Sequence, residues 1–174
     1  TSFVGLGSLN SVGGDMYIIE NPALANLSGL SGLASIGGGL YIVGNGGLVD
    51  LNALVNLTSI NGFLSIGYND ALASLYGLEN INPATITNLL IQNSSQLSFC
   101  EVQSICDYLA IPSNPATITG NAIGCSDRTE VEAACTAVPL CTQLTDPVNG
   151  ATGVPVTTTL SWTALLNEIG RAHV

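Results

Sequence analysis

Short stretches of alternating apolar and polar residues are followed, over most of this chain, by apolar residues three positions apart. The clearest example reads Leu40-x-Ile42-x-x-Asn45-x-x-Leu48-x-x-Leu51. Alternation around Leu40 and Ile42 is typical of a short strand with one buried face. The leucines that follow lie where a looser turn would return apolar side chains to the same interior. The pattern therefore predicts a short strand, a corner and a wide turn.

The same pattern returns at a spacing of 24 residues. One copy has Met16, Ile18, Asn21, Leu24 and Leu27, and another has Leu64, Ile66, Asn69, Leu72 and Leu75. The shift also aligns Leu6, Leu30, Leu54 and Leu78, and a fourth unit with one extra residue has Leu89, Ile91, Ser94 and Leu97. A leucine-rich period of roughly 20–29 residues is the signature of a solenoid. We expect a right-handed leucine-rich-repeat β-solenoid, with parallel β coils of about 24 residues each.

An asparagine recurs at the corner of each unit, at Asn21, Asn45 and Asn69. A buried amide at a bend satisfies backbone groups that the bend leaves unpaired, and stacked copies can bond one another. We therefore expect a structural asparagine ladder rather than a ligand site.

Composition narrows the possible partners. The chain has 174 residues, a net charge of −10 and only two basic residues. Nucleic acids and anionic membranes are poor partners for such a surface, because binding them depends on Lys and Arg. No apolar run approaches the roughly 20 residues that span a bilayer, so no membrane insertion is expected. No motif calls for a cofactor.

The region 98–135 differs from the regular units and is predicted to be a cap over the end of the core. Ser98 fits an N-cap, and the spacing of Val102, Ile105 and Leu109 predicts an amphipathic helix over 99–110. A further short strand and corner asparagine are expected at Ala116–Asn121. Asp127, Glu130 and Glu132 allow a weak calcium site, against the alternative of a solvated acidic surface.

Four cysteines fall in this cap, namely Cys100, Cys106, Cys125 and Cys135. Two structural disulfides are expected rather than a metal site, which would favour Cys-x-x-Cys pairs or histidines. Cys100 and Cys106 are too splayed on one predicted helix to pair easily, so each is expected to bond Cys125 or Cys135. The spacing leaves both connectivities open.

These residues resemble the leucine-rich repeats of receptor L domains, and more closely the repeat arrays of large surface proteins exported by gliding-type Gram-negative bacteria. The resemblance covers Leu6 to about Cys135, with the cap carried by Leu78–Ile81, Cys100–Leu109 and Asn121–Cys125. It implies a secreted or cell-surface, multidomain protein with a role in adhesion or recognition. It identifies no ligand.

The domain organisation follows from a break in the pattern near Pro139. We expect the solenoid and cap over 1–138, a linker over 139–142, and the truncated start of a β-sandwich over 143–167. The last of these resembles a fibronectin-type-III domain, with Trp162 as its core aromatic, and Cys141 would have a partner beyond it. The repeat is already under way at Leu6, which favours an N-terminus further upstream.

The final residues, 168–174, require separate treatment. They back-translate as GAG ATC GGA AGA GCA CAC GTC, which is a widely used sequencing-adapter sequence. We expect this segment to be non-native and exclude it from fold reasoning. The only histidine, His173, is excluded with it, and Arg128 is then the sole basic residue.

The expected function is that of a non-catalytic binding or adhesion module. Tyr17, Tyr41 and Phe63 lie on the outward face of the predicted strands, where they would contact a glycan or a protein. The alternative is that they form only a stabilising ladder. A spacer that projects other domains is a further possibility. A polysaccharide-active enzyme is less favoured, because Asp50 and Asp70 fall in different columns of the repeat and no paired carboxylates converge.

Overall fold

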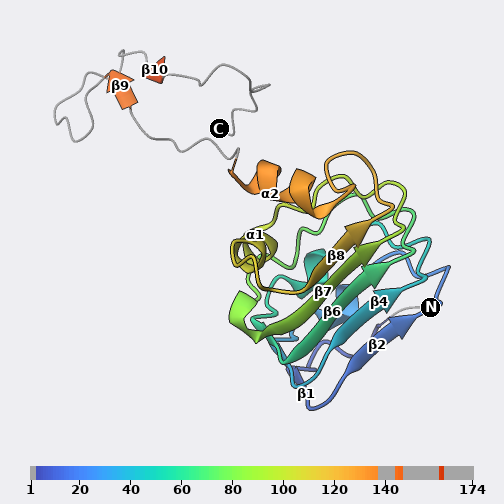
Figure 1. Cartoon of the computed structure of the whole chain (residues 1–174). Coiled ribbons are helices and arrows are strands. Elements are labelled where there is room, and N and C mark those ends of the chain that lie inside the picture. Colours follow the sequence, from blue (N-terminus) through green and yellow to red (C-terminus); the bar gives the residue numbers. More distant parts are fainter. Residues whose placement is uncertain (1–2, 137–143, 147–160, 163–174) are drawn as a thin grey trace. The chain divides into compact units, whose positions relative to one another are not determined.

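The computed structural model describes residues 3–136, 144–146 and 161–162. The chain divides into two compact units, Thr1–Thr136 and Ala137–Val174. The first unit contains the repeats and the two α-helices found among the described residues (Figure 1). No helix among the described residues is both long enough and apolar enough to cross a membrane.

The main feature of the first unit is a five-stranded parallel sheet. Its strands are β2 (Met16–Ile19), β4 (Leu40–Val43), β6 (Gly62–Gly67), β7 (Ile86–Gln92) and β8 (Ala116–Thr119), in that order across the sheet. Leu40 pairs with Met16 on one side and with Leu64 on the other, so neighbouring strands come from successive repeats in exact 24-residue register. The register shifts between Gly62 and Phe63, which pair with Ile86 and Asn88, so the extra residue of this repeat lies within β7.

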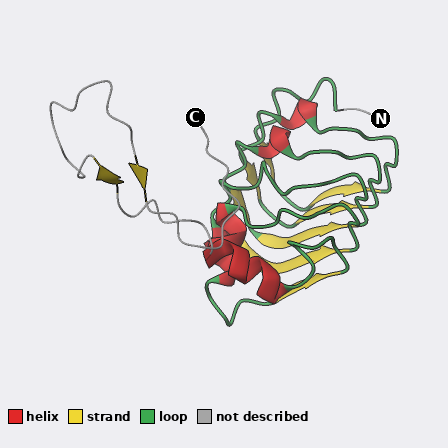
Figure 2. Ribbon diagram, turned by 90° about the horizontal axis from the view of Figure 1, so that it is seen from above, coloured by secondary structure: helices red, strands yellow, loops and turns green. Residues whose placement is uncertain are grey.

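The opposite side of each repeat is built from shorter elements. A three-stranded parallel sheet contains β1 (Ser11–Val12), β3 (Ser35–Ile36) and β5 (Ser59–Ile60). Single turns of 3-10 helix precede these strands or follow them, at η1 (Ser28–Leu30), η2 (Asn52–Leu54) and η3 (Pro83–Thr85). Figure 2 shows the successive repeats lying side by side, with the strands of the main sheet along one side.

The core lies between these two sides. The predicted inward residues Leu40, Ile42, Leu48 and Leu51 are fully buried. Apart from Met16, which is partly buried, their equivalents in the neighbouring repeats are also buried: Ile18, Leu24, Leu27, Leu64, Ile66, Leu72 and Leu75. Apolar side chains from each repeat therefore form one continuous core. Burial of this kind contributes about 25 cal/mol per Å² of apolar surface and is the main stabilising interaction.

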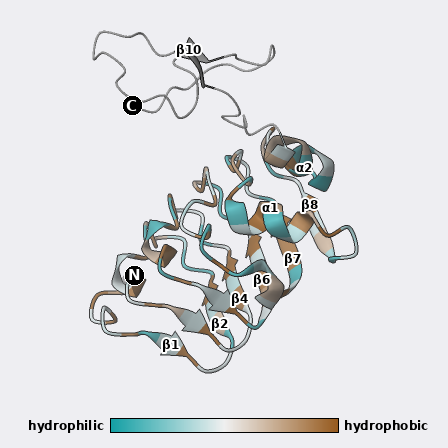
Figure 3. Cartoon of the chain, turned by 90° about the vertical axis from the view of Figure 1, so that its left-hand side faces the viewer, coloured by the Kyte–Doolittle hydropathy of each residue, from teal (hydrophilic) through white to brown (hydrophobic). Residues whose placement is uncertain are grey.

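The cap differs in part from the prediction. Helix α1 covers Gln103–Leu109, with Val102 at its N-cap position, so the predicted start at Phe99 with a Ser98 cap is wrong. Ser98 and Phe99 instead donate backbone hydrogen bonds to Ala73, and Phe99 pairs with Ser74 in a parallel bridge. Sheet-like pairing with the preceding repeat holds them extended. The helix itself is amphipathic, with both apolar and polar stretches visible in Figure 3.

The four cap cysteines form two disulfides, Cys100–Cys125 and Cys106–Cys135. Their Cα atoms are 5.6 and 5.4 Å apart, within the usual range for a disulfide. The first bond ties the start of the cap to the loop before helix α2 (Arg128–Thr136). The second ties α1 to the last turn of α2. Both helices are thus covalently fixed at the same end of the core.

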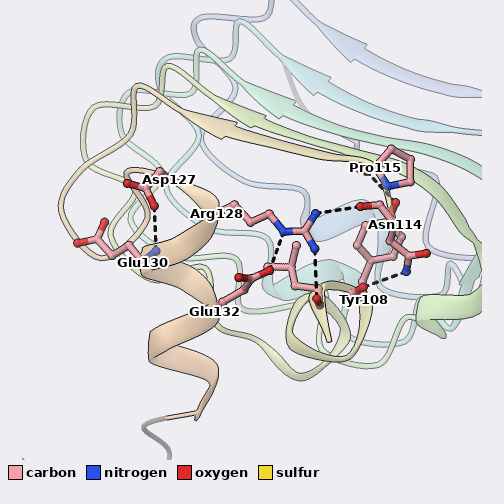
Figure 4. A network of polar contacts seen from close by, with 8 residues as sticks. Tyr108, Asn114, Pro115, Asp127, Arg128, Glu130 and Glu132 are labelled. Atoms are coloured by element: carbon pink, nitrogen blue, oxygen red, sulfur yellow. Dashed lines mark hydrogen bonds and ion pairs between the residues drawn. The ribbon is translucent and has the colours of Figure 1, made fainter. Parts of the chain in front are cut away.

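Arg128 links the two helices through an ion pair and hydrogen bonds (Figure 4). Its guanidinium pairs with Glu132 at 2.6 Å and donates to the backbone carbonyls of Asn114 and Leu109. The carbonyl of Leu109 belongs to the last turn of α1, where a cation is favoured by the helix dipole. The single basic residue of the described chain therefore closes the cap.

The second unit is described only at two short strands. β9 (Leu144–Asp146) and β10 (Ser161–Trp162) pair antiparallel. The predicted linker at 139–142, Cys141, most of the predicted sandwich at 143–167 and the segment 168–174 lie outside the described residues.

Candidate binding surface

The three aromatic residues singled out from the sequence come together on the outward face of the main sheet. Tyr17 and Tyr41 are register partners on β2 and β4, and their ring centroids lie 4.7 Å apart at an interplanar angle of 14°. Phe63, on β6, stacks on Tyr41 at 5.9 Å and 8°. The rings form a continuous stack across three strands, which we call the aromatic stack.

Phe63 joins this stack although it lies two positions before the register partner of Tyr41, which is Ser65. The reason is Gly39. A Cβ atom at Gly39 would lie 2.7 Å from Cε2 and 2.9 Å from the hydroxyl oxygen of Tyr41, so the tyrosine ring leans back over the glycine. The ring of Phe63 then lies beside it. A side chain at position 39 would displace the central ring.

The carboxylate of Asp15 holds the Tyr17 ring in place through a hydrogen bond with its hydroxyl. The Tyr17 hydroxyl donates to Asp15 Oδ2 at 2.9 Å, and the Gly39 backbone N–H donates to Asp15 Oδ1 at 2.6 Å. These two hydrogen bonds, that from Gly39 above all, lower the pKa of Asp15 below its usual value, and the bond to Asp15 raises the pKa of Tyr17. Around neutral pH the pair is therefore an ionised carboxylate and a neutral phenol.

The face around the aromatic stack carries few charges. Ile19 and Val43 form the next row, and Leu90 and Gln92 continue the rows on β7. Thr117 and Thr119 complete them on β8. Tyr17 is 60% exposed and Ile19 is 43% exposed. The surface is thus apolar on the β2 side and neutral and polar on the β8 side.

The asparagine ladder is present as a chain of hydrogen bonds between successive repeats. The backbone N–H of Asn21 donates to Asn45 Oδ1 at 3.1 Å, and that of Asn45 donates to Asn69 Oδ1 at 3.0 Å. The side-chain nitrogens of Asn45 and Asn69 donate to the carbonyls of Ile18 and Ile42 in the preceding repeat. Asn45 and Asn69 are fully buried. Their amides act on neighbouring backbone, which is a structural role.

The ladder extends beyond the residues predicted for it. The backbone N–H of Asn69 donates to Ser94 Oγ, and that of Ser94 donates to Asn121 Oδ1. Ser94 aligns with the asparagines once the extra residue of the fourth unit is allowed for, and its hydroxyl replaces the amide oxygen. Asn121 was expected only as a corner. The signal in the sequence was local: Ser94 and Asn121 each stand three positions after a strand isoleucine, Ile91 and Ile118, as Asn45 does after Ile42.

A second aromatic pair was missed by the sequence analysis. Tyr76 and Phe99 stack with centroids 4.8 Å apart at 17°. They adjoin the parallel bridge between Ser74 and Phe99 and are not part of the five-stranded sheet. Tyr76 is 53% exposed. This pair resembles Tyr17–Tyr41 in geometry and exposure but belongs to a different surface.

The acidic candidates have structural contacts. Asp50 Oδ1 accepts the backbone N–H of Asn52, and Asp70 Oδ1 accepts bonds from Ser95. The Asp127 carboxylate accepts the backbone N–H of Glu130 (Figure 4), and the carboxylate of Glu130 accepts the N–H of Ser126. Within the described parts of the chain, no three His, Cys, Asp or Glu side chains are grouped in a way that could hold a metal ion.

One shallow hollow of about 420 Å³ lies on the turn side of the repeats. Its lining combines polar turn residues with two apolar ones: Asn26, Leu27, Ser28, Ser31, Asp50, Asn52 and Ala53. The Asp50 carboxylate is already bonded to the adjacent turn. The hollow brings together no pair of groups suited to acid–base chemistry.

The chain was compared with protein-family models, with curated proteins and with solved structures, and none of them matches it.

Proposed function

We propose that residues 3–136 form a leucine-rich-repeat solenoid that serves as a non-catalytic extracellular binding module, and that it binds a protein ligand through the outward face of the main sheet. The observation that carries the proposal is the aromatic stack on that face. Tyrosine and phenylalanine are enriched at the energetic centres of protein interfaces. A surface that exposes Tyr17 and Ile19 side by side has the apolar character of such a centre.

Ring geometry favours a protein over a glycan. Sugars pack on the faces of aromatic rings, but both faces of the Tyr41 ring are covered by Tyr17 and Phe63. Each end ring has one face without an aromatic neighbour: beyond Tyr17 there is no described strand, and on the far side of Phe63 the register partner is Asn88 of β7. The ligand would therefore meet ring edges, together with Ile19 and Val43. Ring edges and branched aliphatic groups suit apolar and aromatic side chains.

An extracellular or cell-surface location is part of the proposal. The two disulfides support it, because such bonds persist in oxidising compartments and are rare in the cytosol. Both lie in the cap, where they stabilise the end of the core.

The hydrogen bonds and the ion pair that the carboxylates make within the protein support a binding role over an enzymatic one. Asp15, Asp50, Asp70 and Glu130 each accept a backbone N–H, and Glu132 pairs with Arg128. A glycoside-cleaving site needs two carboxyl groups that face a common substrate across a defined gap. Here Asp15 and Asp70 instead join neighbouring repeats, Asp50 closes a turn, and Glu130 and Glu132 stabilise α2.

The experiment is a binding screen of the full chain against immobilised extracellular proteins and, in parallel, immobilised glycans. For a protein partner found in this way, replacing Tyr17 and Tyr41 with Ala should weaken binding by at least about tenfold, since buried aromatic anchors dominate interface energetics. The fold should persist, because cross-strand aromatic pairs contribute only about 0.2–1 kcal/mol each.

Tyr76→Ala is the matched control. It removes a tyrosine of similar exposure from the other stacked pair, so a partner of the main sheet should bind this variant normally. Equal losses in the two variants would contradict the assignment of the face. Binding of glycans alone would contradict the assignment of a protein ligand.

A further inference from the structure

The two ends of the repeat stack are unlike each other. At the β8 end, Ile118 is buried and both helices cover the core, held by the two disulfides. At the β1–β2 end, Leu6 is 41% exposed, whereas its equivalents Leu30, Leu54 and Leu78 are fully buried. The core at this second end therefore faces solvent.

The same difference holds along the rest of the first repeat. Leu9, Val12 and Met16 are only partly buried, while their equivalents Leu33, Ile36 and Leu40 have no exposed surface. No described element covers these side chains. Exposed apolar surface at the end of a repeat array is ordinarily covered by a further repeat or a cap.

Residues 3–12 form half of a repeat. β1 pairs with β3 in the smaller sheet, as β3 pairs with β5. In the main sheet, by contrast, no described strand lies beyond β2. The smaller sheet thus begins one repeat earlier than the main sheet. The strand that would accompany β1 in the same repeat would lie against the free edge of β2.

That edge has unpaired hydrogen-bonding groups. The N–H groups of Met16 and Glu20 donate to the carbonyls of Gly39, just before β4, and of Val43, at its end. Alternation along a strand directs the N–H groups of Tyr17 and Ile19 to the other side, where no described residue pairs with them. Asn21 also lacks a hydrogen-bond partner among the described residues on this side. Its side-chain nitrogen bonds its own strand at Ile19, and its side-chain oxygen accepts no hydrogen bond from the described residues.

We infer that this edge accepts one further parallel β strand, joined ahead of Phe3, which completes the repeat whose other half is residues 3–12. The strand has the apolar-x-apolar pattern of Met16–Ile19 and is followed by a corner residue whose N–H donates to Asn21 Oδ1. It covers Leu6, Leu9 and Met16 and lies on the free ring face of Tyr17.

The test joins a copy of Asp15–Leu24 directly ahead of Thr1, which sets the copy 24 residues before the original. Hydrogen exchange at the backbone amides of Tyr17 and Ile19 should slow at least about tenfold relative to the unextended chain, because both groups become paired. Amides of β7 in the same sample report that the rest of the sheet is intact.

The control extension carries Asn in place of the copied Met16 and Ile18, and it should give no protection, because its strand has no apolar side to bury. Asn21→Ala in the chain with the unaltered extension should reduce the protection. Unchanged exchange at Tyr17 and Ile19 with the unaltered extension, while β7 stays protected, would overturn the inference. Equal protection from the control extension would overturn it as well.

Discussion

At the scale of single residues, the corner of each repeat is set by one left-handed position. Glu20, Gly44, Tyr68, Asn93 and Gly120 all have φ between 50° and 72°, and each directly precedes a residue of the hydrogen-bonded ladder. The left-handed turn directs the next backbone N–H toward the side chain of the following repeat. Only two of the five positions are glycine, although glycine adopts this conformation at least cost. Glu20 and Tyr68 therefore hold local strain that the ladder offsets.

Introducing glycine at one left-handed position and removing it from another should change the stability of the fold in opposite directions. Glu20→Gly should stabilise the fold by up to about 1 kcal/mol, because it relieves a left-handed φ in an exposed residue. Gly44→Ala should cost about 1–2 kcal/mol. A Cβ at Gly44 would meet nothing closer than 3.4 Å, so its cost reports φ alone. Urea unfolding of the two variants measures both effects. A loss of stability in Glu20→Gly would show that the strain argument fails.

At the scale of elements, the sequence predicted what the 24-residue period repeats and missed what occurs once. The strands, the buried leucines and Asn21, Asn45 and Asn69 were predicted because each residue type returns at the same position. The left-handed column was missed because Glu20 and Tyr68 have no residue type in common. The start of α1 was misplaced because Ser98 and Phe99 pair with the preceding repeat, a tertiary interaction that outweighs local capping preference.

Helix α2 gives the prediction that belongs to this scale. Hydrogen bonds from the hydroxyl and backbone N–H of Ser126, and then from the N–H of Gly124, hold the pKa of Glu130 below its usual value of 4.5. A lowered pKa means that the stabilisation is present above pH 4.5 and is lost as the pH falls through the folded-state value. Thermal unfolding of Glu130→Gln between pH 3 and pH 6 should therefore show a weaker dependence on pH than the parent chain.

Glutamine is the appropriate replacement because its side-chain oxygen can still accept the Ser126 N–H while it carries no titrating charge. Asp15, whose pKa is also lowered, remains in the variant, so part of the acid sensitivity should persist. Parallel curves of melting temperature against pH for the two chains would contradict the role given to Glu130.

At the scale of the whole first unit, a single column of leucines connects the repeats. Each repeat contributes a side chain that packs between those of its two neighbours, so the cost of a truncation depends on whether both neighbours are present. At one end the cap covers the column: Val102, Ile105 and Leu109 are buried in the same core, and the Ser104 hydroxyl donates to the carbonyl of Leu78. At the β1–β2 end the column finishes at Leu6 without a described neighbour on its outer side. Stability is therefore graded along the stack.

Two equivalent positions in this column test the gradient. Leu54→Ala removes a fully buried side chain from the middle of the stack and should cost about 2–5 kcal/mol, through lost burial and the cavity left behind. Leu6→Ala is the same change at the β1–β2 end of the column, at a residue that is 41% exposed. It should lower the free energy of unfolding by less than half as much, because solvent already reaches the site. Chemical unfolding of both variants, with the denaturant dependence checked to be unchanged, measures the difference. Equal losses would mean that the side chain of Leu6 is covered in solution, which would contradict a solvent-facing core at this end of the unextended chain.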